Sequence, residues 1–401
     1  MKSGVIKSLY LMSIPVGSLL LAYALWPAVQ SDPALARLVR HAPHVLFGAA
    51  LALAWRFNQS RVFFMLLVFL VGYLFVTGWA GQAEYAVVYT AVSVLVPVNT
   101  LLFAFLKERG ILTTRGKCYL AFLPAQVLVV ALWWAAGEEA VQFLQTGVLN
   151  SGSMHWTPLP VLSVLLFLAA VVGLTARMVY TQSFADGCSA GALAAAALGL
   201  HFDSVLELSY FTAVAGLILL VAVLQRMYAM AYLDELTGLP GRRALREEKM
   251  KLGDSFTLAL VDVDHFKQFN DRYGHAAGDE VLRFVASFLR QVSGGGKAFR
   301  YGGEEFVLVF PGRGLKDTLP HLETLREKIA GKPFVLRGKD RSKEKPPKER
   351  EPRGSNRKVT ITVSVGAAEK RREHKTCADV FRAADAALYR AKQKGRNRVS
   401  T

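Results

Sequence analysis

The stretch KAFRYGGEEFVLVF, residues 297–310, decides how the second half of this 401-residue chain folds. Two short β-prone runs flank the pair Gly302-Gly303. A Gly-Gly pair between two such runs is typical of a β-hairpin with a tight turn. The sequence therefore predicts a hairpin whose turn presents two adjacent carboxylates, Glu304 and Glu305.

Strand and helix signals alternate around this hairpin. The run 256–261 is short, apolar and β-prone, and it ends on Asp262, while residues 359–365 alternate as a strand does. Helices are expected over 278–292, 317–330 and 377–394. The pattern predicts an α/β domain in which a mixed sheet is flanked by helices.

Acidic and basic side chains are expected to meet at one edge of this sheet. If the strand that ends on Asp262 lies beside the hairpin, Asp262, Glu304 and Glu305 converge there. Carboxylates without His or Cys partners suit Mg²⁺, particularly where phosphates complete the coordination. Basic residues for such phosphates are Lys267, Lys392 and Arg396. Each residue taken alone is equally well explained as a solvated charge, so the hypothesis rests on their convergence.

The first half of the chain has a different composition. The whole chain is 52% hydrophobic with a net charge of +17, yet residues 1–226 hold only 12 Lys and Arg and 8 Asp and Glu. Most apolar runs there approach the ~20 residues that cross ~30 Å of hydrocarbon as a helix. The runs are 8–29, 41–56, 62–80, 85–106, 118–136, 157–176, 188–202 and 207–225. We therefore expect a polytopic membrane domain over 1–226 with about eight spans, a short helical linker over 227–233 and a globular domain over 234–401.

Charges in the joints between these runs predict the orientation. With the amino terminus inside, ten basic residues fall in the inner joints and only Arg37 and Arg40 in the outer ones. The inner residues are Lys2, Lys7, Arg56, Arg61, Lys107, Arg109, Arg115, Lys117, Arg177 and Arg226. The outer joints hold Asp32, Glu84, Glu138, Glu139, Asp203 and Glu207. The positive-inside rule then puts both termini in the cytoplasm, and six spans would give the same orientation as eight.

Histidines gather near the predicted outer side. They are His41, His44, His155 and His201, and several outer acids lie beside them. Such groups could bind a metal or sense pH, or they could be interfacial residues with local hydrogen bonds. The three cysteines are far apart and indicate neither a disulfide framework nor a zinc site.

Five blocks in the second half give the chain a resemblance to a known family. They are DELTGLPGRR (234–243), DVDHFKQFNDRYGHAAGDEVL (262–282), RYGGEEF (300–306), TVSVG (362–366) and ADAALYRAKQKGRNR (384–398). Segment 233–398 resembles the GGDEF domain of diguanylate cyclases, in which these blocks occur in the same order. The resemblance implies that two GTP molecules condense to cyclic di-GMP with release of two pyrophosphates.

The resemblance also implies roles for particular residues. Asp262, Glu304 and the main-chain carbonyl of Val263 would hold Mg²⁺ or Mn²⁺, and Glu304, or else Glu305, would help to deprotonate the attacking hydroxyl. The Gly302-Gly303 turn would let the backbone approach the α-phosphate. Residues expected to contact the substrate are Asn270 and Asp279 for guanine, Lys267, Lys392 and Arg396 for the triphosphate, and Arg300 near the transferring phosphate.

Because each such domain binds one GTP, the resemblance implies a homodimer. With the predicted spans, it places the protein in the bacterial cytoplasmic membrane as a multi-pass protein. Two positions depart from the family pattern. Gly241 stands where relatives usually have Asn, which predicts a changed loop. Residues 293–296 read Ser-Gly-Gly-Gly where many relatives carry an Arg-x-x-Asp product-binding motif, so no product-inhibition site is expected.

Residues 332–358 form a basic insertion with 11 Lys and Arg against 4 Asp and Glu. Its Pro and charge content predicts a mobile loop. The loop could lie on anionic lipid, or it could be a solvated insertion; no motif accompanies it that would indicate nucleic-acid binding.

Three other functions compete with diguanylate cyclase activity. The first is a catalytically weak GTP-binding regulator attached to a membrane sensor. The second is a transporter or channel with a cytoplasmic regulatory domain, for which the spans contain few embedded charges and no paired repeat. The third is a nuclease-like or adenylate cyclase activity, against which Asn270 and Asp279 argue.

Overall fold

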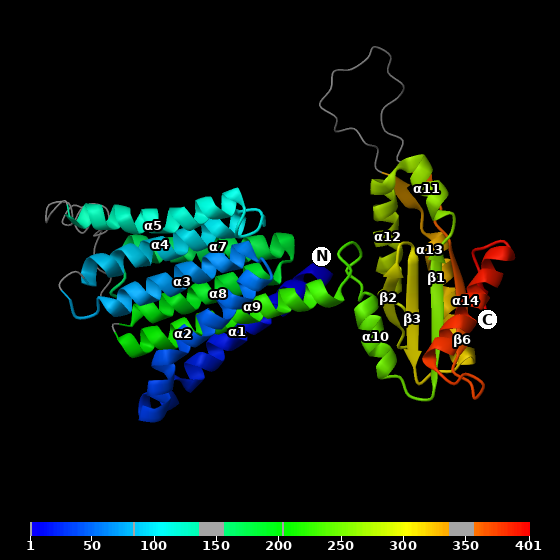
Figure 1. Ribbon diagram of the computed structural model, residues 1–401, viewed down its shortest axis with the longest axis horizontal. Helices are drawn as coiled ribbons and strands as arrows, with labels where there is room; N and C mark the ends of the chain where they lie inside the picture. Colours follow the sequence, from blue (N-terminus) through cyan, green and yellow to red (C-terminus); the bar gives the residue numbers. More distant parts are fainter. Residues whose placement is uncertain (1, 83–84, 136–155, 203, 337–356) are drawn as a thin grey trace, which may run out of the picture. The chain divides into compact units, whose positions relative to one another are not determined.

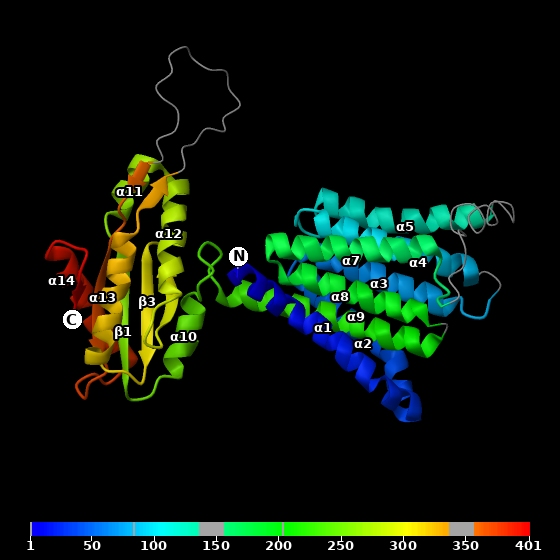
Figure 2. The ribbon, with the colours of Figure 1, turned by 180° about the vertical axis from the view of Figure 1, so that it is seen from behind.

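The computed structural model describes residues 2–401 apart from 83–84, 136–155, 203 and 337–356. It divides into two compact units, Met1–Met227 and Tyr228–Thr401. Figures 1 and 2 show them from opposite sides.

The first unit is a bundle of long helices. Its described helices are α1 (Lys2–Ser31), α2 (Pro33–Arg56), α3 (Ser60–Gly78), α4 (Tyr85–Phe105), α5 (Thr114–Ala135), α7 (Val161–Thr181), α8 (Phe184–His201) and α9 (Val205–Tyr232). Seven of them, all except α8, are long and apolar enough to cross a membrane. The predicted amino-terminal region of potential membrane spans is confirmed, while the count of about eight compares with seven candidates in the described residues.

Helix α2 begins earlier than the apolar run 41–56 predicts. Asp32 caps its start, with Oδ1 accepting the Ala34 N–H at 2.7 Å, and Pro33 occupies the first turn. An Asp-Pro start is a strong helix signal. Arg37 and Arg40, which the pattern of apolar runs assigns to an outer joint, therefore lie within α2.

Helix α8 is built of small residues and is almost wholly buried. It packs against α1 and α7, and its glycines allow this approach. A Cβ on Gly191 would lie 2.4 Å from Cβ of Pro15. Small residues let helices pack closely in a membrane, where tight van der Waals contact replaces the hydrophobic effect. Thus α8, which occupies the predicted run 188–202, is an inner helix of the bundle.

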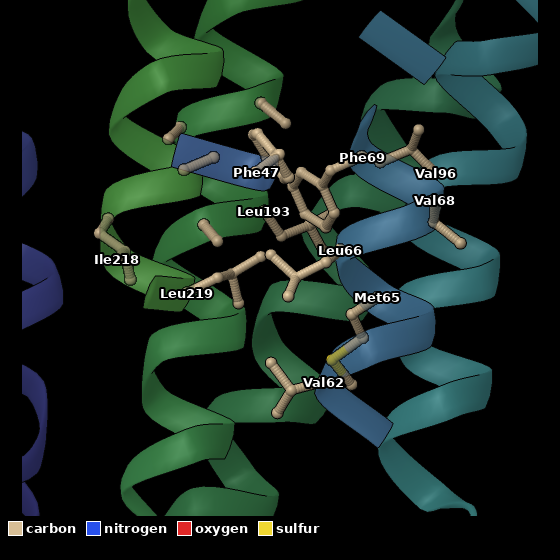
Figure 3. Packing of buried hydrophobic residues seen from close by; sticks show 14 of the residues in the cluster. Phe47, Val62, Met65, Leu66, Val68, Phe69, Val96, Leu193, Ile218 and Leu219 are labelled. Atoms are coloured by element: carbon tan, nitrogen blue, oxygen red, sulfur yellow. The ribbon is translucent and has the colours of Figure 1, made fainter. Parts of the chain in front are cut away.

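Large apolar side chains fill the space between α2, α3, α8 and α9. Figure 3 shows this packing from close by. Members of the cluster that are less than 2% exposed include Phe47, Leu66, Leu193, Ile218 and Leu219. The contact of four helices at one centre holds the bundle together.

Ion pairs link charged side chains of several helices at one end of the bundle. The Asp186 carboxylate at the start of α8 is 1% exposed and lies 3.0 Å from both Arg61 of α3 and Arg177 of α7. Glu108, just after α4, lies 3.3 Å from Arg226 of α9. A charged side chain that is buried among apolar helices is stable only when it is paired with an opposite charge or hydrogen-bonded. The sequence identifies the arginines as orientation signals, but it does not single out Asp186 or Glu108 as their partners.

Two described histidines of the predicted outer group pack against aromatic rings. His44 contacts Tyr73 edge-on, and His201 contacts Trp156. Among the described residues, no group of three or more His, Cys, Asp or Glu could hold a metal ion. Several members of the predicted outer cluster lie outside the described residues, namely Glu84, Glu138, Glu139, His155 and Asp203.

The second unit is built on a five-stranded mixed sheet in the order β2-β3-β1-β6-β7. The strands are β1 (Phe256–Val263), β2 (Lys297–Gly302), β3 (Glu305–Pro311), β6 (Val363–Glu369) and β7 (Val399–Ser400). The helices are α10 (Arg242–Met250), α11 (Phe266–Tyr273), α12 (His275–Leu289), α13 (Leu315–Gly331) and α14 (Cys377–Gln393). β1 is antiparallel to both neighbours, whereas β6 and β7 are parallel. The predicted mixed sheet flanked by helices is confirmed.

The two faces of the sheet have separate cores. One contains side chains of α12 and α13, and the other contains side chains of α10 and α14. Leu258 and Leu260 of β1 belong to the α14 face. Because side chains alternate along a strand, Asp262 points to that face as well. All eight residues of β1 are buried, and Asp262 is the last but one of them. It therefore lies where the strand leaves the core at the edge of the sheet.

The hairpin turn differs from the predicted Gly-Gly pair by one residue. Gly302 pairs with Glu305, so the turn is Gly303-Glu304 and Glu305 begins β3. A register shift between Arg300 and Gly302 displaces the turn, and Gly303 supplies the left-handed conformation with φ of +48°.

The structure also differs from the sequence prediction at one strand, at one helix and in the basic insertion. The strand expected over 359–365 begins at Val363 in the main sheet, and helix α11 was not predicted. The basic insertion is not a loop at its ends, because β4 (Phe334–Leu336) pairs with β5 (Arg357–Val359). The rest of it, 337–356, lies outside the described residues.

Gly366 sets the distance between α14 and β6. A Cβ at this position would lie 2.0 Å from the main-chain nitrogen of Leu388 and 2.3 Å from the carbonyl oxygen of Ala384. Backbone atoms cannot move aside as a flexible side chain can. The glycine of the TVSVG block therefore lets α14 lie directly on the sheet.

We predict that Gly366→Ala destabilises the second unit by about 1–3 kcal/mol, the usual cost of overpacking a core. Hydrogen exchange of the β6 and α14 amides in the full chain measures the loss. Gly253→Ala is the matched control, because nothing lies within 4 Å of a Cβ built there. Equal protection of β6 in the two variants would contradict this explanation.

Candidate functional site

The acidic side chains lie at the end of β1 and on the adjoining hairpin. Asp262 is 5% exposed and pairs in register with Glu305 of β3. Residues that face each other across an antiparallel pair point to the same side of the sheet. Glu304 stands in the turn immediately before β3. The structure thus brings Asp262, Glu304 and Glu305 to one edge.

Two of these acids have raised pKa values. Burial is the main cause of the raised pKa of Asp262, opposed by Lys392 and Arg396. Burial also raises the pKa of Glu304, and the negative charges of Asp262 and Glu305 add to the effect. Mutual repulsion of carboxylates is relieved when a cation lies between them. The site therefore favours a positive charge near Asp262 and Glu304.

The donor atoms at this edge suit a hard divalent ion. Asp262 and Glu304 offer carboxylate oxygens, and Val263, the last residue of β1, follows Asp262 with a main-chain carbonyl. Mg²⁺ is commonly bound through one or two carboxylates, with waters and substrate phosphates completing its shell. The residues present fit Mg²⁺ or Mn²⁺ in that manner.

A lysine ammonium already lies against the buried acid. Nζ of Lys392 is 2.8 Å from Oδ1 of Asp262. Lys392 belongs to α14, which Gly366 allows to approach the sheet, and Arg396 follows shortly after that helix. The positive charges expected from the sequence thus stand beside the acids. A divalent ion bound by Oδ1 of Asp262 would compete with the Lys392 ammonium for this oxygen.

Asn270 and Asp279 lie on the two helices that follow β1 in the chain. α11 carries Asn270 and α12 carries Asp279, with Gly274 between the helices at φ of +82°. Within the described part of the chain, Oδ1 of Asn270 is buried and has no hydrogen-bond partner. It lies against Gly278, where a Cβ would come within 1.8 Å of it. An unsatisfied acceptor of this kind is suited to a donor on a ligand.

Arg300 holds the hairpin turn rather than extending freely from it. Nη1 donates to Oδ1 of Asp234 at 2.8 Å, and Nη2 donates to the carbonyl oxygen of Gly303 at 2.8 Å. These bonds tie the turn to the opening block 234–243. Asp234 and Arg300 form a pair that the motif contains but that sequence reasoning did not identify.

Arg242 approaches the hairpin where Gly302 leaves room. Its Nε donates to the carbonyl oxygen of Tyr301, and a Cβ on Gly302 would lie 2.7 Å from Nη2. Gly241 is the N-cap of α10 and provides no side-chain cap. An Asn there could accept a hydrogen bond from the first turn. The departure at Gly241 therefore removes a potential cap while Arg242 keeps its contact.

Lys267 and residues 293–296 are the remaining predicted positions. Lys267 is exposed in the first turn of α11. Residues 293–296 form a turn in which Gly294 and Gly295 have positive φ. Oγ of Ser293 lies 2.9 Å from Nδ1 of His321. This turn packs against α13 and offers no guanidinium group.

We predict that Mn²⁺ binding by the full chain weakens as the pH falls from about 8 to about 5, because carboxyl groups with raised pKa values take up protons above the ordinary value of about 4. Glu304→Gln should weaken binding at pH 8 and flatten this dependence. Equilibrium titration with Mn²⁺ measures both effects. Glu369→Gln is the control, because a hydrogen bond from Leu315 N–H lowers the pKa of Glu369. A pH dependence that survives in Glu304→Gln would contradict the assignment of Glu304.

Known proteins resemble the second unit. The family described as "Diguanylate cyclase, GGDEF domain" matches residues 231–398. Diguanylate cyclase DgcP of Pseudomonas aeruginosa is 37% identical over 183 residues, which cover 44% of this chain and 24% of DgcP. Diguanylate cyclase VdcA of Vibrio cholerae is 37% identical over 173 residues, which cover 42% of this chain and 46% of VdcA. The match thus spans less than half the length of each of these relatives.

A solved structure resembles the same segment. The coiled coil and GGDEF domain of DgcB from Caulobacter crescentus, in complex with c-di-GMP, is 34% identical, with a TM-score of 0.37. The match covers 44% of this chain and 88% of that one. With the family match and the sequence identities, the ordered blocks give one conclusion: residues 231–398 of this chain belong to the GGDEF-domain family of diguanylate cyclases.

Proposed function

We propose that this protein is a membrane-bound diguanylate cyclase that condenses two GTP molecules into cyclic di-GMP and two pyrophosphates. The observation that carries the proposal is a pair of carboxylates with raised pKa values. Asp262 lies at the end of β1 beside Lys392, and Glu304 lies in the turn of the adjoining GGEEF hairpin. The matched family supplies the reaction class.

In this reaction the 3′-hydroxyl of each GTP attacks the α-phosphorus of the other. A new oxygen–phosphorus bond forms, and the bond to pyrophosphate breaks. Mg²⁺ or Mn²⁺ held by Asp262, Glu304 and the Val263 carbonyl would neutralise phosphate charge and acidify the hydroxyl. Glu304 would accept the hydroxyl proton, and Glu305 is the second candidate.

The chain's own residues position the substrate. Gly303 carries no side chain, so the turn backbone can approach the α-phosphate. Lys392 and Arg396 neutralise the triphosphate, and Lys267 contributes from α11. Arg300 acts through the turn, because its guanidinium is bonded to Asp234 and to the Gly303 carbonyl.

Guanine is recognised by Asn270 and Asp279. The Asp279 carboxylate accepts from guanine N1–H and the exocyclic amine, and the unpaired Oδ1 of Asn270 offers a further acceptor. Adenine presents an acceptor at N1, which a carboxylate repels. This chemistry favours GTP over ATP.

The proposed assembly is a homodimer in the bacterial cytoplasmic membrane, with both termini and the catalytic domain in the cytoplasm. Each catalytic domain binds one GTP, so two must face each other. We assign residues 1–226 to the membrane domain, 227–233 to a helical linker and 234–401 to catalysis. This orientation is supported by the arginines at one end of the bundle. Contact of segment 332–358 with anionic lipid, and the lack of product inhibition through 293–296, remain predictions.

The experiment that tests the activity incubates the full chain in lipid nanodiscs with GTP and Mg²⁺. Mass spectrometry should detect cyclic di-GMP, and Glu304→Gln should reduce the rate by about 10³-fold, as expected when a group that stabilises the transition state is removed. Glu369→Gln is the control. GTP binding without product would favour a GTP-binding regulator, and a product made from ATP would favour another nucleotidyl cyclase.

We predict that Asp279→Asn lowers kcat/KM for GTP by about 10²-fold, since a carboxamide cannot accept both guanine donors. Asp271→Asn is the matched control, an exposed carboxylate next to Asn270. Initial rates with GTP and with ATP measure the change in selectivity. An equal loss in the two variants would contradict guanine recognition by Asp279.

A further inference from the structure

Asp264 has three hydrogen-bond donors around its carboxylate. Oδ2 accepts Thr362 Oγ1 at 2.8 Å and the main-chain N–H of Asn397 at 3.0 Å, while Oδ1 accepts Ser364 Oγ at 2.6 Å. Asp264 N–H also donates to the Thr362 carbonyl at 3.0 Å. One side chain therefore joins the end of β1, the start of β6 and the segment after α14.

The segment after α14 has an unusual backbone. Gly395, Arg396 and Asn397 are consecutive residues with φ of +99°, +60° and +43°. For residues other than glycine, the left-handed region costs roughly 1–2 kcal/mol each. Such strain persists where surrounding contacts over-determine the conformation, and it is a reason to look for a function.

The contacts that hold this strained turn are few and identifiable. Asn397 N–H donates to Asp264, and Arg396 N–H donates to the Ala391 carbonyl at 3.0 Å. Arg326 donates to the Asn397 side chain at 3.1 Å. Asp264 is the acidic member of this set, and its carboxylate accepts a charge-assisted hydrogen bond, the stronger kind, from the turn's own backbone.

This turn bears on the candidate site because it includes Arg396. The positive charge of Arg396 opposes the rise in the pKa of Asp262 that burial causes. Asp264 lies only two residues beyond Asp262 in the same strand end. The carboxylate of Asp264 therefore fixes the Arg396 turn against the strand that presents the metal-binding acid.

We propose that Asp264 is a positioning residue for the triphosphate: it holds the Arg396–Asn397 turn so that the Arg396 guanidinium stands over the site formed by Asp262 and Glu304. The proposal rests on the proposed function, since it assigns Arg396 to the phosphates of the same substrate. Asp264 acts through Arg396 and does not itself touch the reacting atoms.

A double-mutant cycle in the full chain tests this role. Asp264→Asn should raise KM for GTP about tenfold, the equivalent of ~1.4 kcal/mol and within the range for hydrogen bonds to charged groups, while kcat changes less than KM. In an Arg396→Ala background, the same substitution should raise KM by less than about twofold, because the residue it positions is gone. Asp271→Asn should leave KM unchanged.

Two further measurements keep the outcome decisive. Thr362→Val removes one donor to Asp264 and should give a smaller rise in KM that also disappears with Arg396→Ala; it replaces Asp264→Asn if that variant does not fold. Repeating the cycle on the Kd of a non-hydrolysable GTP analogue tests Asp264 even if the wild-type chain makes no product. Independent, multiplicative effects of Asp264→Asn and Arg396→Ala, or a fall in kcat with unchanged KM and Kd, would overturn the proposal.

Discussion

The candidate site of the second unit depends on a buried carboxylate, Asp262, and on its repulsion of the half-buried Glu304 carboxylate. Asp262 reaches the sheet edge at the end of a fully buried strand, and Glu304 stands beside it in the hairpin turn. The ionised form of each acid is destabilised there, because burial and the nearby like charge both favour the protonated form. Lys392 offsets part of that cost by lying 2.8 Å from Asp262. A helix can place its lysine there only because Gly366 lets α14 lie against β6.

The neighbourhood of these acids is held by a small number of polar clamps. Arg300 and Asp234 fix the hairpin turn, and Asp264 fixes the turn after α14. The opening block is tied in turn to the last residue of α9, since Gly241 N–H donates to the Tyr232 carbonyl at 2.7 Å. Each clamp joins segments that are distant in sequence. Their combined effect is to hold together the residues proposed to contact metal, phosphate and base, which come from three separate sequence blocks.

The first unit also buries charged side chains, among helices that are apolar enough to span a membrane. Arginines that favour the inner side of a membrane are also structural, because Arg61 and Arg177 share the Asp186 carboxylate. Helix α8 brings that carboxylate into the bundle while its glycines keep the backbone close to its neighbours. Ion pairing and small-residue packing thus act on the same helix, and both are strongest where water is scarce.

The sequence by itself determined the class of both units and the identity of the second. A short apolar, β-prone run locates β1, helical patterns locate α12 and α14, and the ordered motif blocks identify the GGDEF domain. Tertiary structure alone decided the turn at Gly303-Glu304, the pairing of Arg300 with Asp234 and the three bonds to Asp264. The reason is physical: local patterns report which face of an element is buried, whereas strand register and the partners of buried charges are set by contacts between residues far apart in the chain.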